Sequence, residues 1–315
     1  MTLQPAPDLP PGTAPQDLVE LVRLLRRIPD SARRLYCTPE WAWRRLRVRP
    51  DLLTYFAAQG LPHRRDADGL YFDRYDLLNC SLQLGQGTLA KAVRRFWPLA
   101  LRRAAAGVRA HYEMQYQARC PEPGHAGPCH FRVTLPGGDY AERVVDGDTA
   151  APDASVRVSP EIVWPDLPVR DRSVVDEVDG LEFAVLREEI RWDLDFTRRS
   201  GLADCAGGAR LLAEAAARRG MTSRCSFGYI VTPPFAVEHY WAEVLVEDVW
   251  VPVDPVLIRN MLRWNVLDSA EWPLYRSIGP LVTRVAGEQV PVVLHNGDRV
   301  RFTLPVRLLP APAAP

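Results

Sequence analysis

The chain has 315 residues, of which 47% are hydrophobic and 25% charged, a composition typical of a globular protein with well-filled cores. No segment approaches the roughly 18 uninterrupted apolar residues of a membrane-spanning helix, so we expect no contact with a membrane. The proline-rich residues 1–16 lack the basic start and apolar stretch of a secretory signal, which predicts a cytoplasmic protein. In that reducing compartment, cysteines are more often free, catalytic or metal-bound than paired in disulfides.

The formal net charge is zero, but the charges are distributed unevenly. Residues 31–104 carry 14 basic and 6 acidic side chains, whereas residues 105–315 carry 22 and 29. A basic module joined to an acidic one indicates a binding partner. From changes in proline content, charge and hydrophobic periodicity along the chain we predict five parts: a tail and leading helix over 1–30, a basic module over 31–105, a hairpin-rich insert over 106–150, a linker over 151–173 and a domain over 174–315.

The basic module has a recognisable order of predicted elements. A helix over residues 17–28 comes first, followed within 38–76 by helix, tight turn, helix and hairpin, and then by a helix over 89–105. The pattern over residues 38–82 resembles the winged helix-turn-helix of MerR and excisionase-type proteins. That resemblance implies DNA contact through six arginines, Arg44, Arg45, Arg47, Arg49, Arg64 and Arg65.

A second interpretation of the same module is at least as well supported. The expected recognition helix, Asp51 to Gln59, contains no Arg, Lys or Asn and is therefore poor in side chains that read bases. Winged helices also serve as peptide-binding modules, so DNA binding and recruitment of a peptide or protein substrate both stay open.

Residues 112–145 alternate short apolar and polar pieces around Gly137-Gly138, which predicts hairpins. Within them, four potential zinc ligands fall in 11 residues: Cys120, His125, Cys129 and His130. Adjacent Cys129 and His130 make joint chelation awkward, and the spacing matches no standard finger. We therefore favour a hairpin tip with metal-free thiols over a zinc site, and expect no cofactor.

After the proline-rich linker, helices are predicted over 174–195 and 204–219. The second has well-defined ends, because Asp204 can cap its N-terminus and Gly220 suits the residue after its C-terminus. Cys205 thus lies on the first turn, where the helix dipole favours a thiolate, the nucleophilic form of cysteine. The neighbouring glycines, Gly207 and Gly208, indicate the close approach of a backbone or a substrate.

Strands are predicted over residues 225–231, 239–246 and 249–253, followed by strand-like segments around an Asn296-Gly297 turn. If residues 247–248 form the turn of a hairpin, Val246 pairs with Val249, and His239 lies on the same face as Asp254 and diagonal to it. Diagonal neighbours are about 7–8 Å apart at the backbone, within reach of a hydrogen bond between the imidazole and the carboxylate. The hairpin alone therefore predicts the base and the orienting carboxylate of a Cys-His-Asp triad.

The ordered motifs around these three residues resemble the transglutaminase-like core, over roughly residues 175–260. They are Cys205 opening a helix, then His-Tyr-Trp-Ala-Glu-Val from His239, then Trp-Val-Pro-Val-Asp-Pro around Asp254. The resemblance implies an α+β, cysteine protease-like fold, with Cys205 as nucleophile, His239 as base and Asp254 as orienter. One departure is Asp204, because a carboxylate beside the thiol opposes thiolate formation.

We accordingly predict a cysteine enzyme that hydrolyses or transfers an acyl group at an amide or thioester carbonyl. Candidates for the acyl or oxyanion region are Trp192, Tyr240 and Trp241. Two alternatives are a DNA-binding regulator with a non-catalytic C-terminal sensor domain, and a natural-product enzyme whose winged helix holds a precursor peptide.

Overall fold

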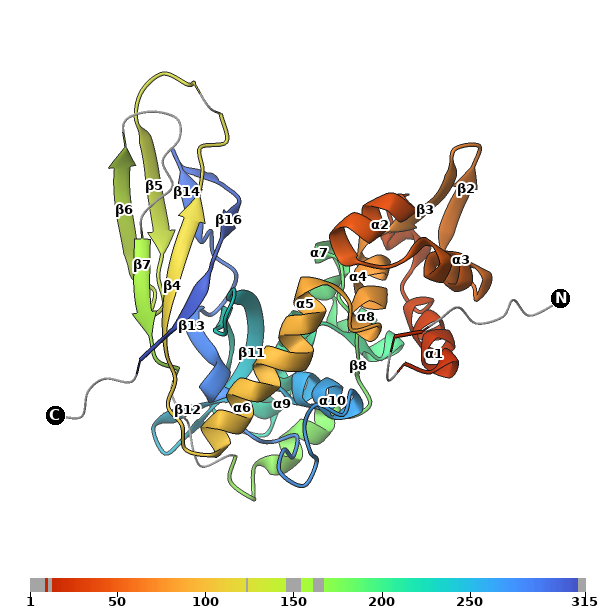
Figure 1. Cartoon of the computed structure of the whole chain (residues 1–315). Coiled ribbons are helices and arrows are strands. Elements are labelled where there is room, and N and C mark those ends of the chain that lie inside the picture. The colour runs from red at the N-terminus through yellow and green to blue at the C-terminus, as the bar shows by residue number, and fades with distance from the viewer. Residues whose placement is uncertain (1–8, 11–12, 123, 146–153, 161–166, 311–315) are drawn as a thin grey trace.

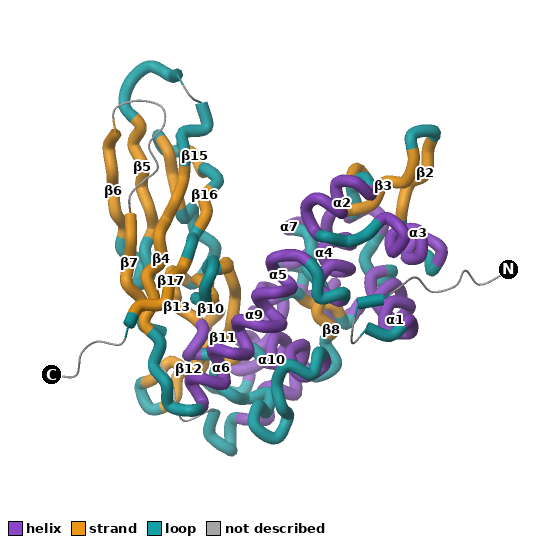
Figure 2. Tube along the Cα trace, viewed as in Figure 1, coloured by secondary structure: helices purple, strands orange, loops and turns teal. Residues whose placement is uncertain are grey.

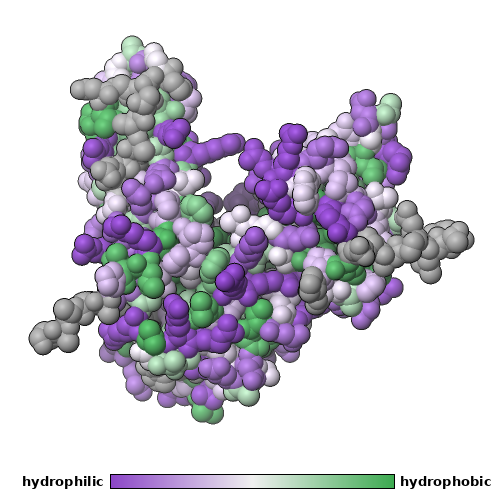
Figure 3. Space-filling model, in the orientation of Figure 1, coloured by the Kyte–Doolittle hydropathy of each residue, from purple (hydrophilic) through white to green (hydrophobic). Residues whose placement is uncertain are grey.

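The computed structural model describes residues 9–10, 13–122, 124–145, 154–160 and 167–310. Helices and strands are mixed and partly segregated, so the predicted α+β class is confirmed (Figures 1 and 2). A lobe of long strands and a helical lobe built from the N-terminal residues rise from a common base, with a hollow between them (Figure 3). Within the described residues, no helix is long and apolar enough to cross a bilayer.

The helical lobe shows the predicted order of helix, turn, helix and hairpin. The Thr38 hydroxyl caps the second helix by accepting from the Trp41 N–H. Arg47, in a left-handed conformation, ends the helix. The elements are α1 (Pro15–Leu25), η1 (Asp30–Ala32), β1 (Leu35–Cys37), α2 (Pro39–Leu46), α3 (Pro50–Ala58), β2 (His63–Asp66), β3 (Gly69–Asp73) and α4 (Arg74–Gln83). The strands form a sheet in the order β1-β3-β2.

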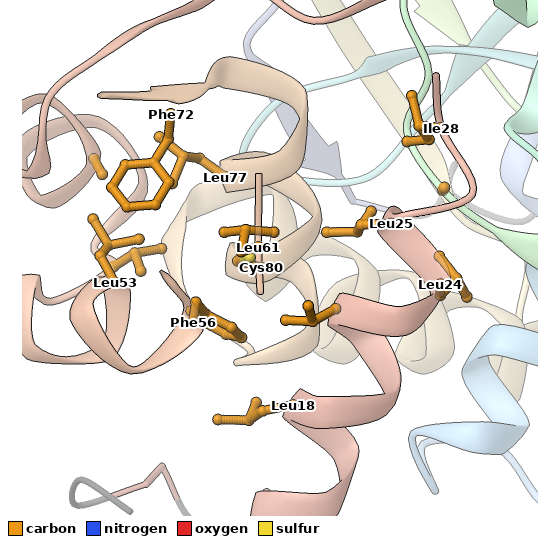
Figure 4. Packing of buried hydrophobic residues seen from close by; sticks show 14 of the residues in the cluster. Leu18, Leu24, Leu25, Ile28, Leu53, Phe56, Leu61, Phe72, Leu77 and Cys80 are labelled. Atoms are coloured by element: carbon orange, nitrogen blue, oxygen red, sulfur yellow. The ribbon is translucent and has the colours of Figure 1, made fainter. Parts of the chain in front are cut away.

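One hydrophobic core, which buried residues between 184 and 202 also enter, holds this lobe together. Leu18 and Leu25 of α1 converge on Phe56 of α3, Phe72 of β3 and Leu77 of α4, all of them fully buried (Figure 4). Burial of each such side chain contributes on the order of 2 kcal/mol, so the five packed together tie the three helices and the hairpin into one unit.

The predicted helix over residues 89–105 is present as a continuous helical stretch with a π-helical middle: α5 (Gly87–Lys91), η2 (Ala92–Phe96) and α6 (Trp97–Ala105). Its apolar side packs on the C-terminal part of the chain, where Trp97 and Leu101 share a core with Trp241, Ile258 and Trp272. In Figure 1 the stretch crosses in front of β11. Its residues Leu89, Val93 and Trp97 form one wall of a cavity that Cys205 and His239 also line.

The strand-rich lobe joins segments from the middle and the end of the chain. Its sheets have the orders β15-β14-β5-β6 and β16-β4-β17, and β7 also pairs with β4. The strands are β4 (His111–Ala118), β5 (Cys129–Thr134), β6 (Tyr140–Val145), β7 (Ala154–Val158), β14 (Val293–His295), β15 (Asp298–Arg299), β16 (Phe302–Thr303) and β17 (Val306–Leu309). Strands β4 and β5, from the predicted insert, thus hydrogen-bond to β14, β16 and β17 of the predicted domain 174–315.

Part of the predicted linker is a strand, because residues 154–158 form β7 on the edge of β4. Other linker residues, 151–153 and 161–166, lie outside the described residues, as does most of the predicted tail. The turn at Asn296-Gly297 is confirmed, with positive φ at both residues, the conformation of a type I′ hairpin.

The central sheet has the order β12-β11-β10-β13 and carries α9 on one face. The β11–β12 hairpin has the predicted register, with Val246 opposite Val249. These elements are α9 (Cys205–Arg218), β10 (Ser223–Ile230), β11 (Val237–Val246), β12 (Val249–Val253), α10 (Pro255–Arg263), η4 (Gly279–Leu281) and β13 (Val282–Ala286).

The predicted helix over residues 174–195 is wrong, because this segment is broken into short pieces. Gly180, with φ of 79°, ends the first piece. The chain then runs extended, and the N–H groups of Glu182 and Ala184 donate to the carbonyls of Gly201 and Ala203. The pieces are η3 (Arg172–Val178), β8 (Glu182–Phe183), α7 (Glu188–Arg191), α8 (Leu194–Ser200) and β9 (Leu202–Ala203).

Candidate active site

Cys205 is the first residue of α9, as predicted, and its side chain is half-buried. The Asp204 carboxylate caps the helix by accepting from the N–H groups of Ala206 and Gly207, at 3.0 and 3.1 Å. A Cβ on Gly207 would lie 3.1 Å from the Arg191 carbonyl oxygen. The close approach expected at this glycine is therefore made by the backbone at the end of α7.

His239 and Asp254 meet across the β11–β12 hairpin. The His239 Nε2 lies 2.7 Å from Asp254 Oδ2, and both side chains are buried. The other carboxylate oxygen of Asp254 accepts from the Leu257 N–H at 2.9 Å, which fixes the carboxylate at the start of α10. Because Nε2 is engaged by Asp254, the opposite nitrogen, Nδ1, is left to face another group.

The Cys205 thiol lines the same cavity as His239 and interacts with its imidazole. Burial disfavours the imidazolium, but the charge on Cys205 and the hydrogen bonds to Asp254 and Cys205 outweigh it, and the pKa of His239 rises above its ordinary value. The three predicted residues are thus brought together in the order Cys, His, Asp.

Sequence reasoning missed Arg191, the last residue of α7. Its Nε lies 2.8 Å from Asp204 Oδ2, and one of its terminal nitrogens lies 3.7 Å from the Cys205 sulfur. The negative charge of Asp204 is therefore balanced by a guanidinium that also faces the thiol. No sequence signal could place Arg191 here, because its position depends on the break in the segment that we expected to be one helix.

A cavity of about 180 Å³ opens beside Cys205 and His239. Its lining is mainly apolar, and it combines the helical stretch over residues 87–105 with β8, β11 and α10. Trp97 of α6 lies edge-on to the His239 ring, with 6.2 Å between ring centroids. The apolar residues of the lining are Leu82, Leu89, Val93, Trp97, Phe183, Val185, Val237, Leu257 and Trp264.

The three predicted acyl or oxyanion residues have different surroundings. Trp192 and Tyr240 pack edge to face at 5.1 Å, and the Arg191 guanidinium lies over the Tyr240 ring. The Trp192 indole N–H donates to Glu188. Trp241 is fully buried and its indole N–H donates to Glu243 at 3.0 Å. Trp241 is therefore a core residue, with its donor already used.

The six arginines of the basic module do not form one uniform surface. Arg49 is half-buried and forms a bidentate pair with Asp51, and Arg64 pairs with Asp66 and stacks on Tyr71. Arg64 is exposed, as are the other four, Arg44, Arg45, Arg47 and Arg65, and the Arg47 guanidinium lies over the Trp43 ring.

Three of the four predicted metal-ligand candidates come together. Cys120, His125 and Cys129 form a cluster, but the fourth member is His295 of β14, not His130. The side chain of His130 is exposed, because along β5 it alternates with the buried Cys129. The sequence could not supply His295, since it lies 166 residues beyond Cys129 and joins the cluster only through the pairing of β14 with β5.

No protein-family model matches the chain, and no curated protein does. Among solved structures, the chain is similar to a protein of Cytophaga hutchinsonii described as a putative cysteine protease, with 10% identity and a TM-score of 0.37. The similarity covers 66% of this chain and 93% of that one. A likeness this distant carries no argument about the chemistry, which depends on the residues of this chain.

Proposed function

We propose that the protein is a cysteine-dependent enzyme of the transglutaminase-like type, which transfers or hydrolyses an acyl group through Cys205, His239 and Asp254. The observation that supports this most is the buried His239–Asp254 hydrogen bond of 2.7 Å, on an imidazole that shares a cavity with Cys205 at a helix N-terminus. A buried carboxylate holding a histidine toward a thiol is the arrangement that activates a nucleophilic cysteine.

In the proposed reaction, the Cys205 thiolate attacks the substrate carbonyl carbon and the imidazolium of His239 carries the proton. Collapse of the tetrahedral adduct breaks the bond to the amine or thiol leaving group, which takes the proton from His239. Water or an amine then attacks the thioester carbon and gives its proton to His239, and the Cys205 thiolate leaves. Asp254 stabilises the imidazolium throughout by accepting its Nε2–H.

The oxyanion of the adduct needs donors next to Cys205. The Asp204 side chain occupies the N–H groups of Ala206 and Gly207, and the Gly208 N–H donates to the Asp204 carbonyl. We therefore assign the role to the Cys205 N–H and to the Arg191 guanidinium, which already lies 3.7 Å from the sulfur.

The cavity beside the triad suggests the class of acyl group. Its walls offer Leu, Val, Phe and Trp side chains, and its volume of about 180 Å³ suits an apolar group of modest size. We propose that the acyl donor presents an aliphatic or aromatic side chain to this cavity while its carbonyl lies over Cys205.

The test is alkylation of the intact chain by iodoacetamide between about pH 5 and about pH 9, with each cysteine followed by mass spectrometry. Cys225 is an internal reference, because it is also half-buried and burial raises the pKa of its thiol to about 11. We expect Cys205 to react far faster than Cys225 below neutral pH, and His239→Ala to abolish the difference. Equal rates for the two thiols would contradict the proposal.

For the basic module we propose contact with a peptide or protein substrate rather than with DNA. The solvent-facing side chains of α3 are Pro50, Asp51, Thr54 and Ala58, which offer one carboxylate and no base-reading donor of the usual kind. By contrast, Trp43 of α2 and Tyr36 of β1 are 44% and 55% exposed, as is common for aromatic anchors at interfaces. Salt-sensitive binding of a labelled duplex, measured by anisotropy at low ionic strength, would favour DNA instead.

A further inference from the structure

Four metal-binding side chains converge at the end of the strand-rich lobe, away from the triad. Cys120 follows β4, His125 lies in the loop after it, Cys129 opens β5 and His295 ends β14. One ligand atom from each lies within 4.8 Å of all the others. The His125 Nε2 is already 3.2 Å from the Cys129 sulfur.

These separations are close to those of an occupied zinc site. With Zn–S near 2.3 Å and Zn–N near 2.0 Å, the edges of a tetrahedron of ligand atoms are roughly 3.3–3.8 Å long. The His125–Cys129 pair, at 3.2 Å, is just below that range, and no pair needs to close by more than about 1.5 Å. Small side-chain rotations cover such a difference without any change in the strands.

A second and independent observation is an unsatisfied buried nitrogen. His295 is 5% exposed, and its Nε2 has no hydrogen-bond partner among the described residues. The His295 ring packs edge-on to His125, with 5.5 Å between ring centroids, and against Phe131 at 4.9 Å. Buried polar atoms are nearly always paired with protein, water or an ion, so a nitrogen in this position indicates a missing ligand.

The surroundings of the cluster also fit a metal site. The His125 Nδ1 lies 3.0 Å from the Ala126 carbonyl oxygen, an arrangement that places the proton on Nδ1 and leaves the Nε2 lone pair directed at the cluster. Outside the ligands, the His130 N–H donates to Asn296 Oδ1 and the Asn296 N–H donates to the His130 carbonyl, both at 2.9 Å. These bonds hold the ends of β5 and β14 in register, and with them Cys129 and His295.

We propose that Cys120, His125, Cys129 and His295 bind one Zn²⁺ ion in a closed tetrahedral site. Two thiolates and two imidazoles are a ligand set that zinc prefers, and four protein ligands leave no open position for a substrate. The ion therefore has a structural role: it ties the loop between β4 and β5 to β14. The site shares no residue with the triad.

The first experiment measures metal in the purified full-length chain by elemental analysis, and then the visible absorption of the chain after exchange of the metal for Co²⁺. We expect one zinc ion per chain, and after exchange the intense d–d bands of tetrahedral cobalt with thiolate charge-transfer bands. A chain that takes up no cobalt, or that contains a Cys120–Cys129 disulfide, would overturn the proposal.

The matched variants are His125→Gln, at a half-buried proposed ligand, and His130→Gln, at an exposed histidine five residues further along the chain. We expect His125→Gln to lose the tetrahedral cobalt spectrum and His130→Gln to keep it. A chelator should lower the Tm of the wild type and of His130→Gln but leave that of His125→Gln unchanged, since ligand binding stabilises only a chain that holds the site. Equal loss of cobalt in the two variants would refute the assignment. Cys205→Ser should keep the metal, which would show that the ion does not bind at the candidate nucleophile.

Discussion

The pairing of Arg191 with Asp204 predicts a measurable coupling between the two residues. Asp204 is 2% exposed, with one oxygen bonded to two helix N–H groups and the other 2.8 Å from Arg191. Removal of one partner of a buried ion pair costs about 3–5 kcal/mol. Because the helix N–H groups still solvate the carboxylate, we expect Arg191→Met to lower the free energy of unfolding by about 3 kcal/mol, at the lower end of that range.

Asp204→Asn keeps the capping oxygen and removes the negative charge, so we expect it to cost less, about 1–2 kcal/mol. In the double variant neither charge is left without its partner, and the combined loss should fall short of the sum by at least about 1 kcal/mol. Urea denaturation of the four proteins measures this cycle. Losses that add to within about 0.5 kcal/mol would show that the two side chains do not interact.

The same variants separate stability from chemistry. Arg191 places a cation 3.7 Å from the Cys205 sulfur, so Arg191→Met should slow alkylation of that thiol at about pH 6 by roughly fivefold or more. Asp204→Asn removes an opposing charge and should not slow it. If Arg191→Met alkylates as fast as the wild type, the guanidinium does not stabilise the thiolate.

Three further predictions follow from single sites. Asp254→Asn should keep the cap on Leu257 and most of the stability, yet reduce Cys205 alkylation at low pH, because the imidazole loses its anionic partner; an unchanged rate would argue against the triad. Gly228→Ala should lower the free energy of unfolding, measured by urea denaturation, by about 3 kcal/mol or more, because its Cβ would overlap the Thr283 carbonyl oxygen. Gly287→Ala is the control: its Cβ would make ordinary contacts at 3.7 Å, so the free energy of unfolding should change by less than about 0.5 kcal/mol. Asp76 is buried in α4, and this burial raises the pKa of its carboxyl to about 6, because it outweighs the opposite effect of the nearby Arg33 guanidinium. Its protonated form therefore contributes stability that is complete below about pH 4 and lost as the pH rises through about 6, and Asp76→Asn should flatten that part of the stability profile.

Local rules predicted much of the candidate site. The cap at Asp204, the strand alternation of β11 and the two-residue turn of the hairpin are short-range features, and together they placed Cys205, His239 and Asp254 on the correct elements. The hydrogen bond of 2.7 Å between the last two confirms the predicted register.

What escaped prediction depends on contacts between distant segments. The segment over residues 174–195 has helical periodicity, but its residues Glu182 and Phe183 form β8 and pair with β9, and the break in the helix places Arg191 3.7 Å from the thiol. His295 reaches Cys129 because β14 adds to β5 from the far end of the chain. In both cases a tertiary pairing outweighs the local preference, and a single sequence holds no record of such a pairing.

The position of Trp97 has a consequence for modularity. The residues that carry the proposed chemistry all lie after residue 190, but Leu89, Val93 and Trp97 form part of the cavity beside them, and Trp97 lies against the catalytic candidate His239. A gene fragment cut between the helical part and the strands would keep all three members of the proposed triad and lose part of the cavity that we propose receives the acyl group. Recombination or domain transplantation at the apparent boundary near residue 105 would therefore separate reactivity from specificity.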